Sequence, residues 1–151
     1  MKPYVKRLRG LGIDASALRL PRGSAERAIS SLREEVGTGL ATSVIGGHSF
    51  GGRVASMVAA DTKPVGLVLL SYPLHRPGPT DELRAEHWSR IACPVLLLSG
   101  DRDQFARIEL LERSVRLLPH AELHIYPGLR HGLLAVADDV AGRIARFVRS
   151  L

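Results

Sequence analysis

The chain has 151 residues, 45% hydrophobic and 24% charged, so it is long enough for one globular domain with its own core. Its formal net charge is +6, but the 21 basic residues are scattered among acids and aromatic residues make up only 5%, which argues against a nucleic-acid-binding surface. No apolar run suits a membrane span or a signal peptide, and the single cysteine, Cys93, excludes an internal disulfide. We therefore expect one cytoplasmic domain over residues 1–151 that binds neither nucleic acid nor membrane.

The N-terminal third predicts two helices with a short strand between them. A basic helix is expected over residues 3–11, and the alternation of small and apolar residues predicts a strand over 13–20, closed by a turn at 21–23. Ser24 is the expected N-cap of a helix over residues 25–36.

The rest of the chain alternates apolar runs with helical segments. Runs that are apolar throughout are typical of strands buried on both faces, as in a parallel sheet covered by helices. Strands are expected at residues 43–48, 65–70, 94–98 and, more weakly, 122–126. Helices are expected at residues 81–91, 107–118 and 138–148. This alternation predicts a doubly wound α/β sheet, whose chemistry gathers beyond the carboxyl ends of the strands.

Ser49 lies in the sequence Gly47-His48-Ser49-Phe50-Gly51, between an apolar strand and a helix. A serine on such a tight turn is held in a strained backbone conformation that exposes its hydroxyl, and the two glycines let strand and helix approach. Ser49 is therefore a candidate nucleophile. The alternative is a Gly-rich turn or a phosphate-cradling loop, but the chain has no G-x-x-x-x-G-K-[ST] sequence.

Asp103 and His131 each follow a later predicted strand, in the chain order Ser, Asp, His that suits a nucleophile elbow. His131 would take the proton of Ser49 and return it to the leaving group, while Asp103 would orient the imidazole. Asp101 is the main alternative for the acid, and both aspartates could instead cap the following helix. His131 could be an ordinary loop histidine.

Other histidines favour structural roles. His48 precedes the nucleophile, but successive side chains of a strand point to opposite faces, so His48 is expected on the face opposite Ser49. Packing or hydrogen bonding, rather than catalysis, is therefore expected for it. His120 and His124 are four residues apart in or near a strand, where this spacing does not converge as it would on a helix. No further ligand cluster accompanies them, so no metal is expected.

The segment 72–92 is the excursion long enough to wall a substrate site. Tyr72 and Leu74 are the residues expected to line it, and Trp88 suits either the core or the site. Such a pocket would be shallow and would favour a small or exposed acyl group.

The chain resembles a small, nearly lidless α/β hydrolase, similar to the dienelactone-hydrolase-like branch and to the hydrolase-like domain of a subunit of a eukaryotic histone-acetyltransferase complex. The resemblance runs through residues 47–52, 71–75, 100–103 and 128–132 and covers essentially the whole chain. It implies a three-layer α/β-hydrolase fold with a mostly parallel sheet. It also implies an esterase that acts on a small-molecule acyl substrate through acyl-Ser49, without a cofactor. In that family the acid is the fourth residue of a G-x-x-D turn, which selects Asp103.

The resemblance further implies that part of the usual fold precedes this chain. One oxyanion donor would be the backbone N–H of Phe50, but the second normally comes from a loop after the third strand, upstream of residues 3–11. We therefore expect an N-terminally truncated sheet in which strands 13–20 and 43–48 pair directly or leave a gap. The alternative function is a non-catalytic or weakly active interaction domain, and the sequence leaves open a homo-oligomer.

Overall fold

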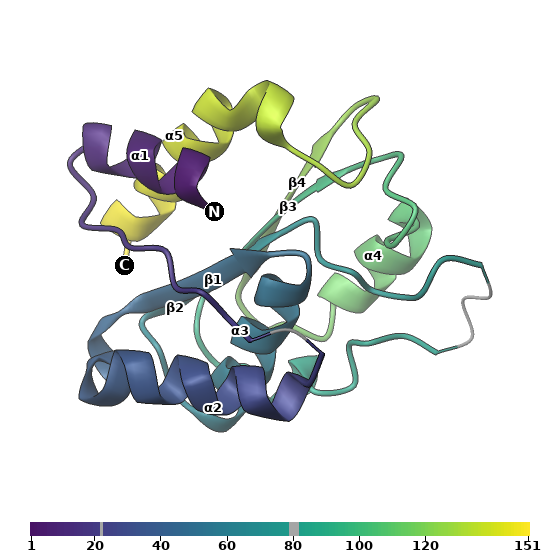
Figure 1. Ribbon diagram of the computed structural model, residues 1–151. Helices are drawn as coiled ribbons and strands as arrows, with labels where there is room; N and C mark the ends of the chain where they lie inside the picture. Colours follow the sequence, from purple (N-terminus) through teal and green to yellow (C-terminus); the bar gives the residue numbers. More distant parts are fainter. Residues whose placement is uncertain (22, 79–81) are drawn as a thin grey trace.

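Four parallel strands form one sheet, in a computed structural model that describes residues 1–21, 23–78 and 82–151 (Figure 1). The strands, which pair in the order β1-β2-β3-β4, are β1 Val44–His48, β2 Gly66–Leu70, β3 Val95–Gly100 and β4 Ala121–Tyr126. The α-helices of the described residues are α1 Lys2–Gly10, α2 Ala25–Val36, α3 Phe50–Asp61, α4 Ile108–Val115 and α5 Ala137–Arg149. Figure 1 shows α1 and α5 on one side of the sheet and α2 and α3 on the other.

The two faces of the sheet form two separate hydrophobic cores. In β2, Leu67 and Leu69 pack with α3, whereas the intervening Val68 and Leu70 pack with α5. Alternate side chains of a strand point to opposite faces, so a strand covered on both sides needs an apolar residue at every position. This is why the apolar runs of β2 and β3 are uninterrupted, and the expected three-layer arrangement is confirmed.

The helices begin and end close to where the sequence predicts. Ser24 caps α2, since its side chain accepts a hydrogen bond from the backbone N–H of Arg27 at 3.3 Å. In α5 the residues Val140, Ile144 and Phe147 are buried against the sheet, as their helical spacing indicates.

Two of the predicted elements are wrong. Residues 13–20 form no strand: Leu18 and Leu20 pack against one core while Ile13 and Ala15 pack against the other, and their backbone pairs with none of the four strands. Residues 82–91 form turns and the short 3₁₀ helix Trp88–Arg90 rather than an α-helix. Position 22 of the predicted turn and position 81 of the predicted helix lie outside the described residues.

The carboxyl ends of the strands are level with one another, which sets the place of the site. The backbone N–H of Ser49, just after β1, donates to the Leu70 carbonyl at the end of β2 at 2.9 Å. The N–H of Ser71 donates in turn to the Leu98 carbonyl of β3 at 2.8 Å. Segments that follow these strands therefore meet at one edge, while β1 itself has a strand partner on one side only.

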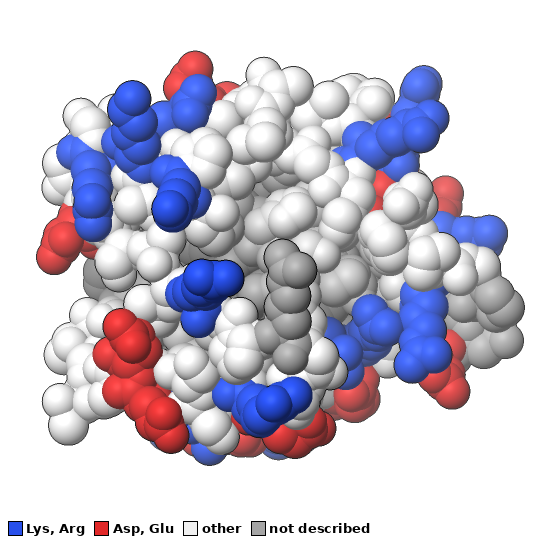
Figure 2. Space-filling view, in the orientation of Figure 1, with Lys and Arg blue, Asp and Glu red and all other residues white. Residues whose placement is uncertain are grey.

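The surface is basic but mixed. Figure 2 shows Lys and Arg side chains spread over one face, separated by acidic and uncharged residues. Within the part of the chain that the structure describes, no helix has the length and apolar character needed to cross a bilayer.

Candidate active site

Ser49 lies on a strained turn between β1 and α3, as the sequence predicts. Its φ of 52° and ψ of −120° fall where residues other than glycine are rare. The turn closes because Gly47 lies against α3: a Cβ there would meet the backbone of Gly51 and lie 2.7 Å from the Gly52 nitrogen. A Cβ on Gly52 would approach the Gly47 carbonyl to 2.8 Å, whereas Gly51 faces open space. The second glycine needed for close approach is therefore Gly52 and not Gly51.

Ser49, His131 and Asp103 form one chain of hydrogen bonds. His131 Nε2 lies 2.7 Å from Ser49 Oγ, and His131 Nδ1 lies 2.8 and 2.9 Å from the two carboxylate oxygens of Asp103. The Nδ1–H group donates to the carboxylate, which leaves Nε2 free to accept the hydroxyl proton of Ser49. The three residues come from loops that follow β1, β3 and β4.

Asp103, rather than Asp101, faces the imidazole. The Asp103 side chain is fully buried and also accepts a hydrogen bond from the Phe105 N–H at 2.9 Å. Asp101 instead accepts from the backbone N–H of Gly128 at 2.7 Å, which ties the turn after β4 to the end of β3. The two aspartates thus have separate contacts, one to His131 and one to the loop that carries it.

Gly100 allows the His131 loop to lie directly on the end of β3. A Cβ at Gly100 would collide with the Leu129 carbonyl and lie 2.8 Å from the Arg130 carbonyl oxygen. The Arg102 N–H donates to the same Leu129 carbonyl at 2.9 Å. His131 follows these two residues immediately, so its position depends on a glycine at the strand end.

His48 is hydrogen-bonded to the loop that carries His131. Its Nε2–H donates to the backbone carbonyl of His131 at 3.1 Å, and the two rings lie 5.3 Å apart. Burial lowers the pKa of His48, which favours the neutral ring with its proton on the Nε2 that donates this bond. Phe105 also packs against His131, with ring centroids 4.4 Å apart. His131 is therefore in contact with two further rings, those of His48 and Phe105.

The three residues expected to bind substrate lie in different surroundings. Phe50 is the first residue of α3, where backbone N–H groups have no partner within the helix, and its side chain is 38% exposed. Tyr72 and Leu74 do not line an open pocket, because both are buried in the core. The Tyr72 ring packs edge-on against Trp88, burial raises its pKa to about 12, and its hydroxyl donates to the Arg84 carbonyl at 2.5 Å.

His120 is exposed and His124 is half-buried in β4. His124 packs edge-on against Tyr126, with ring centroids 4.6 Å apart. Among the described residues there is no group of three His, Cys, Asp or Glu side chains placed to hold a metal ion.

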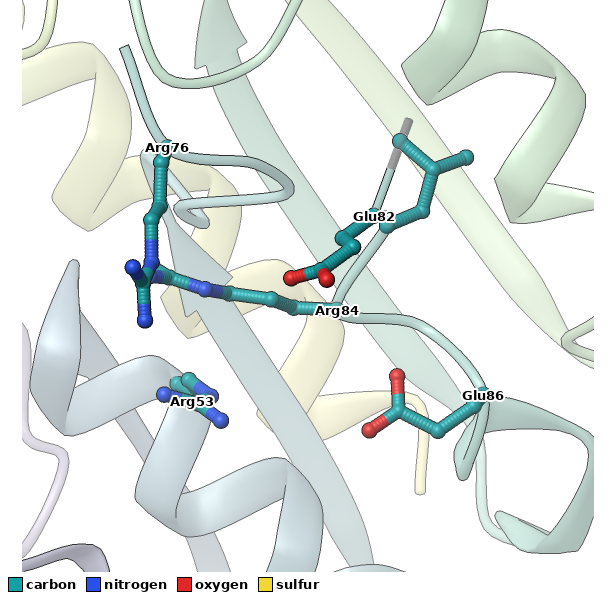
Figure 3. Close-up of a pocket in the computed structure, with 6 residues that line it drawn as sticks. Arg53, Arg76, Glu82, Arg84 and Glu86 are labelled. Carbon is teal, nitrogen blue, oxygen red and sulfur yellow. The ribbon is translucent and has the colours of Figure 1, made fainter. Parts of the chain in front are cut away.

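A cavity that reaches α3 one helical turn from Ser49 was missed by the sequence reasoning, and Ser49, Asp103 and His131 are not among its lining residues. It measures about 320 Å³ and its polar lining, drawn in Figure 3, comes from α3 and from the segment after β2. The lining residues are Arg53, Arg76, Glu82, Leu83, Arg84 and Glu86. Arg53 had a usable signal, since a residue four positions after the nucleophile lies one helical turn from it. The others carry none, because only the folded loop brings them together.

Comparison with known proteins identifies the family of the chain. A sequence profile of the alpha/beta hydrolase domain matches residues 18–140. A segment covering 47% of the chain is 41% identical over 73 residues to a non-heme haloperoxidase of Rhodococcus erythropolis and covers 25% of that protein. The chain thus spans about a quarter of the length of the curated relatives it matches.

Solved structures share the fold at low identity. A thermophilic esterase from Thermogutta terrifontis superposes with a TM-score of 0.74 at 16% identity, over 99% of this chain and 84% of the esterase. A monoacylglycerol lipase of Paleococcus ferrophilus gives a TM-score of 0.73 at 18% identity, over 97% of this chain and 87% of the lipase. With the profile match across most of its length, the chain belongs to the alpha/beta hydrolase domain family.

Proposed function

We propose that this chain is a serine hydrolase that cleaves an ester or related acyl bond through an acyl-Ser49 intermediate. The observation that carries the proposal is the continuous contact from Ser49 Oγ to His131 Nε2 at 2.7 Å and from His131 Nδ1 to Asp103 at 2.8 Å. A serine hydroxyl is a weak nucleophile at neutral pH, and an adjacent oriented base is what activates it.

The reaction runs in two halves. His131 takes the proton of Ser49 as Oγ attacks the acyl carbon, and the imidazolium that forms lies against the buried Asp103 carboxylate. His131 then gives the proton to the departing alcohol, which leaves the acyl group on Ser49. Water, deprotonated by His131, attacks this ester to form a tetrahedral intermediate. Its collapse frees the acid as His131 returns the proton to Ser49 Oγ.

The negative oxygen that develops in each half needs hydrogen-bond donors. The Phe50 N–H, at the first position of α3, is our candidate for one of them, since the helix itself leaves this group without a partner. Removing one such donor typically slows the reaction about a hundred- to a thousand-fold.

Finer features of the function rest on the sequence motifs. The motifs at residues 47–52 and 128–132 are our basis for grouping the chain with the dienelactone-hydrolase-like members of the family. We further propose that it acts on a small-molecule acyl substrate, needs no cofactor and is cytoplasmic. A series of aryl esters tests the expected shallow pocket, because a preference for long acyl chains would contradict it.

Labelling with a fluorophosphonate probe tests the nucleophile. We expect one adduct, mapped by mass spectrometry to Ser49, with no adduct in the Ser49→Ala variant and much slower labelling in His131→Ala. Folding of each protein is checked by circular dichroism. Folded protein that gives no Ser49 adduct and hydrolyses no aryl ester would instead support a non-catalytic interaction domain with this fold.

A further inference from the structure

The cavity beside the site has an unbalanced set of charges. Among the described residues, three guanidinium groups line it against two carboxylates, which gives this part of the lining a formal charge of +1. The ion pairs formed within 4.0 Å between described residues include none of these three arginines, although the two glutamates line the same space. Figure 3 shows the ends of Arg53, Arg76 and Arg84 gathered on one side of the cavity, while Glu82 and Glu86 enter from the other.

Gathering three like charges is unfavourable unless something compensates for it. Burial and the positive charges of Arg53 and Arg76 lower the pKa of Arg84. Arg53 Nε is buried and has no hydrogen-bond partner among the described residues, a situation that ordinarily costs stability. A bound oxyanion would supply the missing negative charge, and a small shift of the Arg53 side chain toward it would give the buried Nε an acceptor.

Two hydrogen bonds fix the backbone of Arg84 in the wall of the cavity. The Arg84 N–H donates to the Leu74 carbonyl at 2.7 Å, and the Arg84 carbonyl accepts from the Tyr72 hydroxyl at 2.5 Å. Buried Tyr72 and Leu74, which do not touch the cavity themselves, therefore hold its wall in place.

Arg76 is tied to the segment that carries the acid. The buried His75 accepts a hydrogen bond from the Arg107 N–H at its Nε2, at 3.0 Å, so its Nδ1 carries the proton and donates to the Arg76 carbonyl at 2.7 Å. The His75 N–H donates to the carbonyl of Phe105, whose ring contacts His131.

Arg53 connects the cavity to the nucleophile. Its backbone N–H donates to the Ser49 carbonyl at 3.1 Å, which places it one turn along α3. Side chains on a helix lean toward its N-terminus, so the Arg53 side chain extends back toward the turn that holds Ser49. One turn of helix plus an arginine side chain puts an anion held here on the order of 5–10 Å from Ser49.

We propose that this arginine pocket, formed by Arg53, Arg76 and Arg84, binds a carboxylate on the ester that Ser49 cleaves. The substrate is then an ester with a carboxylate about four to seven atoms from the scissile bond, a span that corresponds to this distance. A monoanionic carboxylate matches the formal charge of +1 carried by the described lining residues, whereas a phosphate dianion exceeds it. This inference rests on the proposed hydrolase function.

The experiment compares esters that differ only in the charged end. Monoethyl adipate is paired with ethyl hexanoate, and ω-acetoxyhexanoate with hexyl acetate, so that the carboxylate lies on the acyl or on the leaving side. For at least one pair we expect kcat/KM to be about tenfold or more higher for the charged ester, as for charge-assisted hydrogen bonds. The preference should weaken as salt is added.

Variants assign the preference to the pocket. The double variant Arg76→Gln with Arg84→Gln should lose most of the preference, and Arg53→Gln is the second test, with folding checked for both. Arg116→Gln, at the exposed C-terminal end of α4, is the matched control for Arg53→Gln, and Arg113→Gln with Arg116→Gln, both exposed, is the control for the double variant. Equal rates for both members of each pair, or a preference that survives the double variant, would overturn the proposal. An acetoxyalkyl phosphate preferred over ω-acetoxyhexanoate would overturn the choice of carboxylate.

A binding measurement tests the arginine pocket independently of the hydrolase function. The Ser49→Ala protein is titrated calorimetrically with each charged ester and its neutral partner. Tighter binding of a charged ester, lost in the double variant, supports the pocket even where fluorophosphonate finds no active Ser49. Labelling of Ser49 without any such difference in binding leaves the hydrolase intact and refutes the pocket.

Discussion

Replacing Gly100 by alanine should disable the site from a residue that makes no contact with substrate. The added Cβ would collide with the Leu129 carbonyl and lie 2.8 Å from the Arg130 oxygen, and both are backbone atoms of the loop that carries His131. Ordinary contacts of this kind lie near 3.5 Å or more, so the loop must move by about 1 Å.

A movement of that size breaks the hydrogen bonds of the imidazole. His131 lies 2.7 Å from Ser49 Oγ, and a further 1 Å takes the pair beyond hydrogen-bonding range. Misplacement on this scale typically lowers the rate about a hundredfold, and overpacking costs about 1–3 kcal/mol of stability.

The assay measures kcat/KM for an aryl ester, the rate of fluorophosphonate labelling and the urea midpoint on the same preparations. Gly142→Ala is the control, because a Cβ in this turn of α5 has its nearest neighbour at 3.8 Å, the flexible end of Arg146. Gly142→Ala should keep its activity and gain up to about 1 kcal/mol from helix propensity. A folded Gly100→Ala protein that labels at the wild-type rate would refute the reasoning.

Three further outcomes follow from the same contacts. Asp103→Asn should keep the fold but lower kcat by about three to four orders of magnitude, because an amide no longer selects the Nδ1–H form of His131; a kcat within tenfold of wild type in ester assays would contradict this. His48→Ala should lower kcat/KM several-fold without moving its pH profile, and His48→Gln, which keeps a donor for the His131 carbonyl, should recover part of the loss. Burial lowers the pKa of His48 and His87 below the ordinary value near 6.5, so the unfolded chain binds more protons. The free energy of unfolding should therefore be level above about pH 6.5 and fall below it, which urea titrations at several pH values would reveal.

The sequence predicts those parts of the fold that depend on local pattern. Burial on both faces leaves a continuous apolar run, so β2 and β3 were identifiable, and Ser24 marks the start of α2 because its side chain is a local acceptor. The elbow at Ser49 is equally local, since strand, glycine and serine are adjacent in the chain.

The predictions that were wrong concern residues whose structure depends on contacts between distant segments. Residues 13–20 have an alternating pattern, yet a strand exists only where another strand pairs with it, and here the apolar side chains are used for packing alone. Tyr72 follows a strand as a pocket residue would, but its hydroxyl is used to hold Arg84. In the arginine pocket only Arg53 had a sequence signal, from its spacing to Ser49, because the other members come together only when the segment after β2 folds against α3.

The position of β1 at the rim of the sheet has a consequence for how the protein loses activity on heating. β1 is held by β2 alone, whereas β2 and β3 each have neighbours on both sides. Elements with fewer backbone partners open at lower free energy than the centre of a sheet, and β1 leads directly into the strained Ser49. Amide exchange should therefore be faster in β1 than in β3, and inactivation should precede global melting. The nucleophile and its base therefore both follow edge strands, since β4, which precedes His131, is likewise paired on one side only.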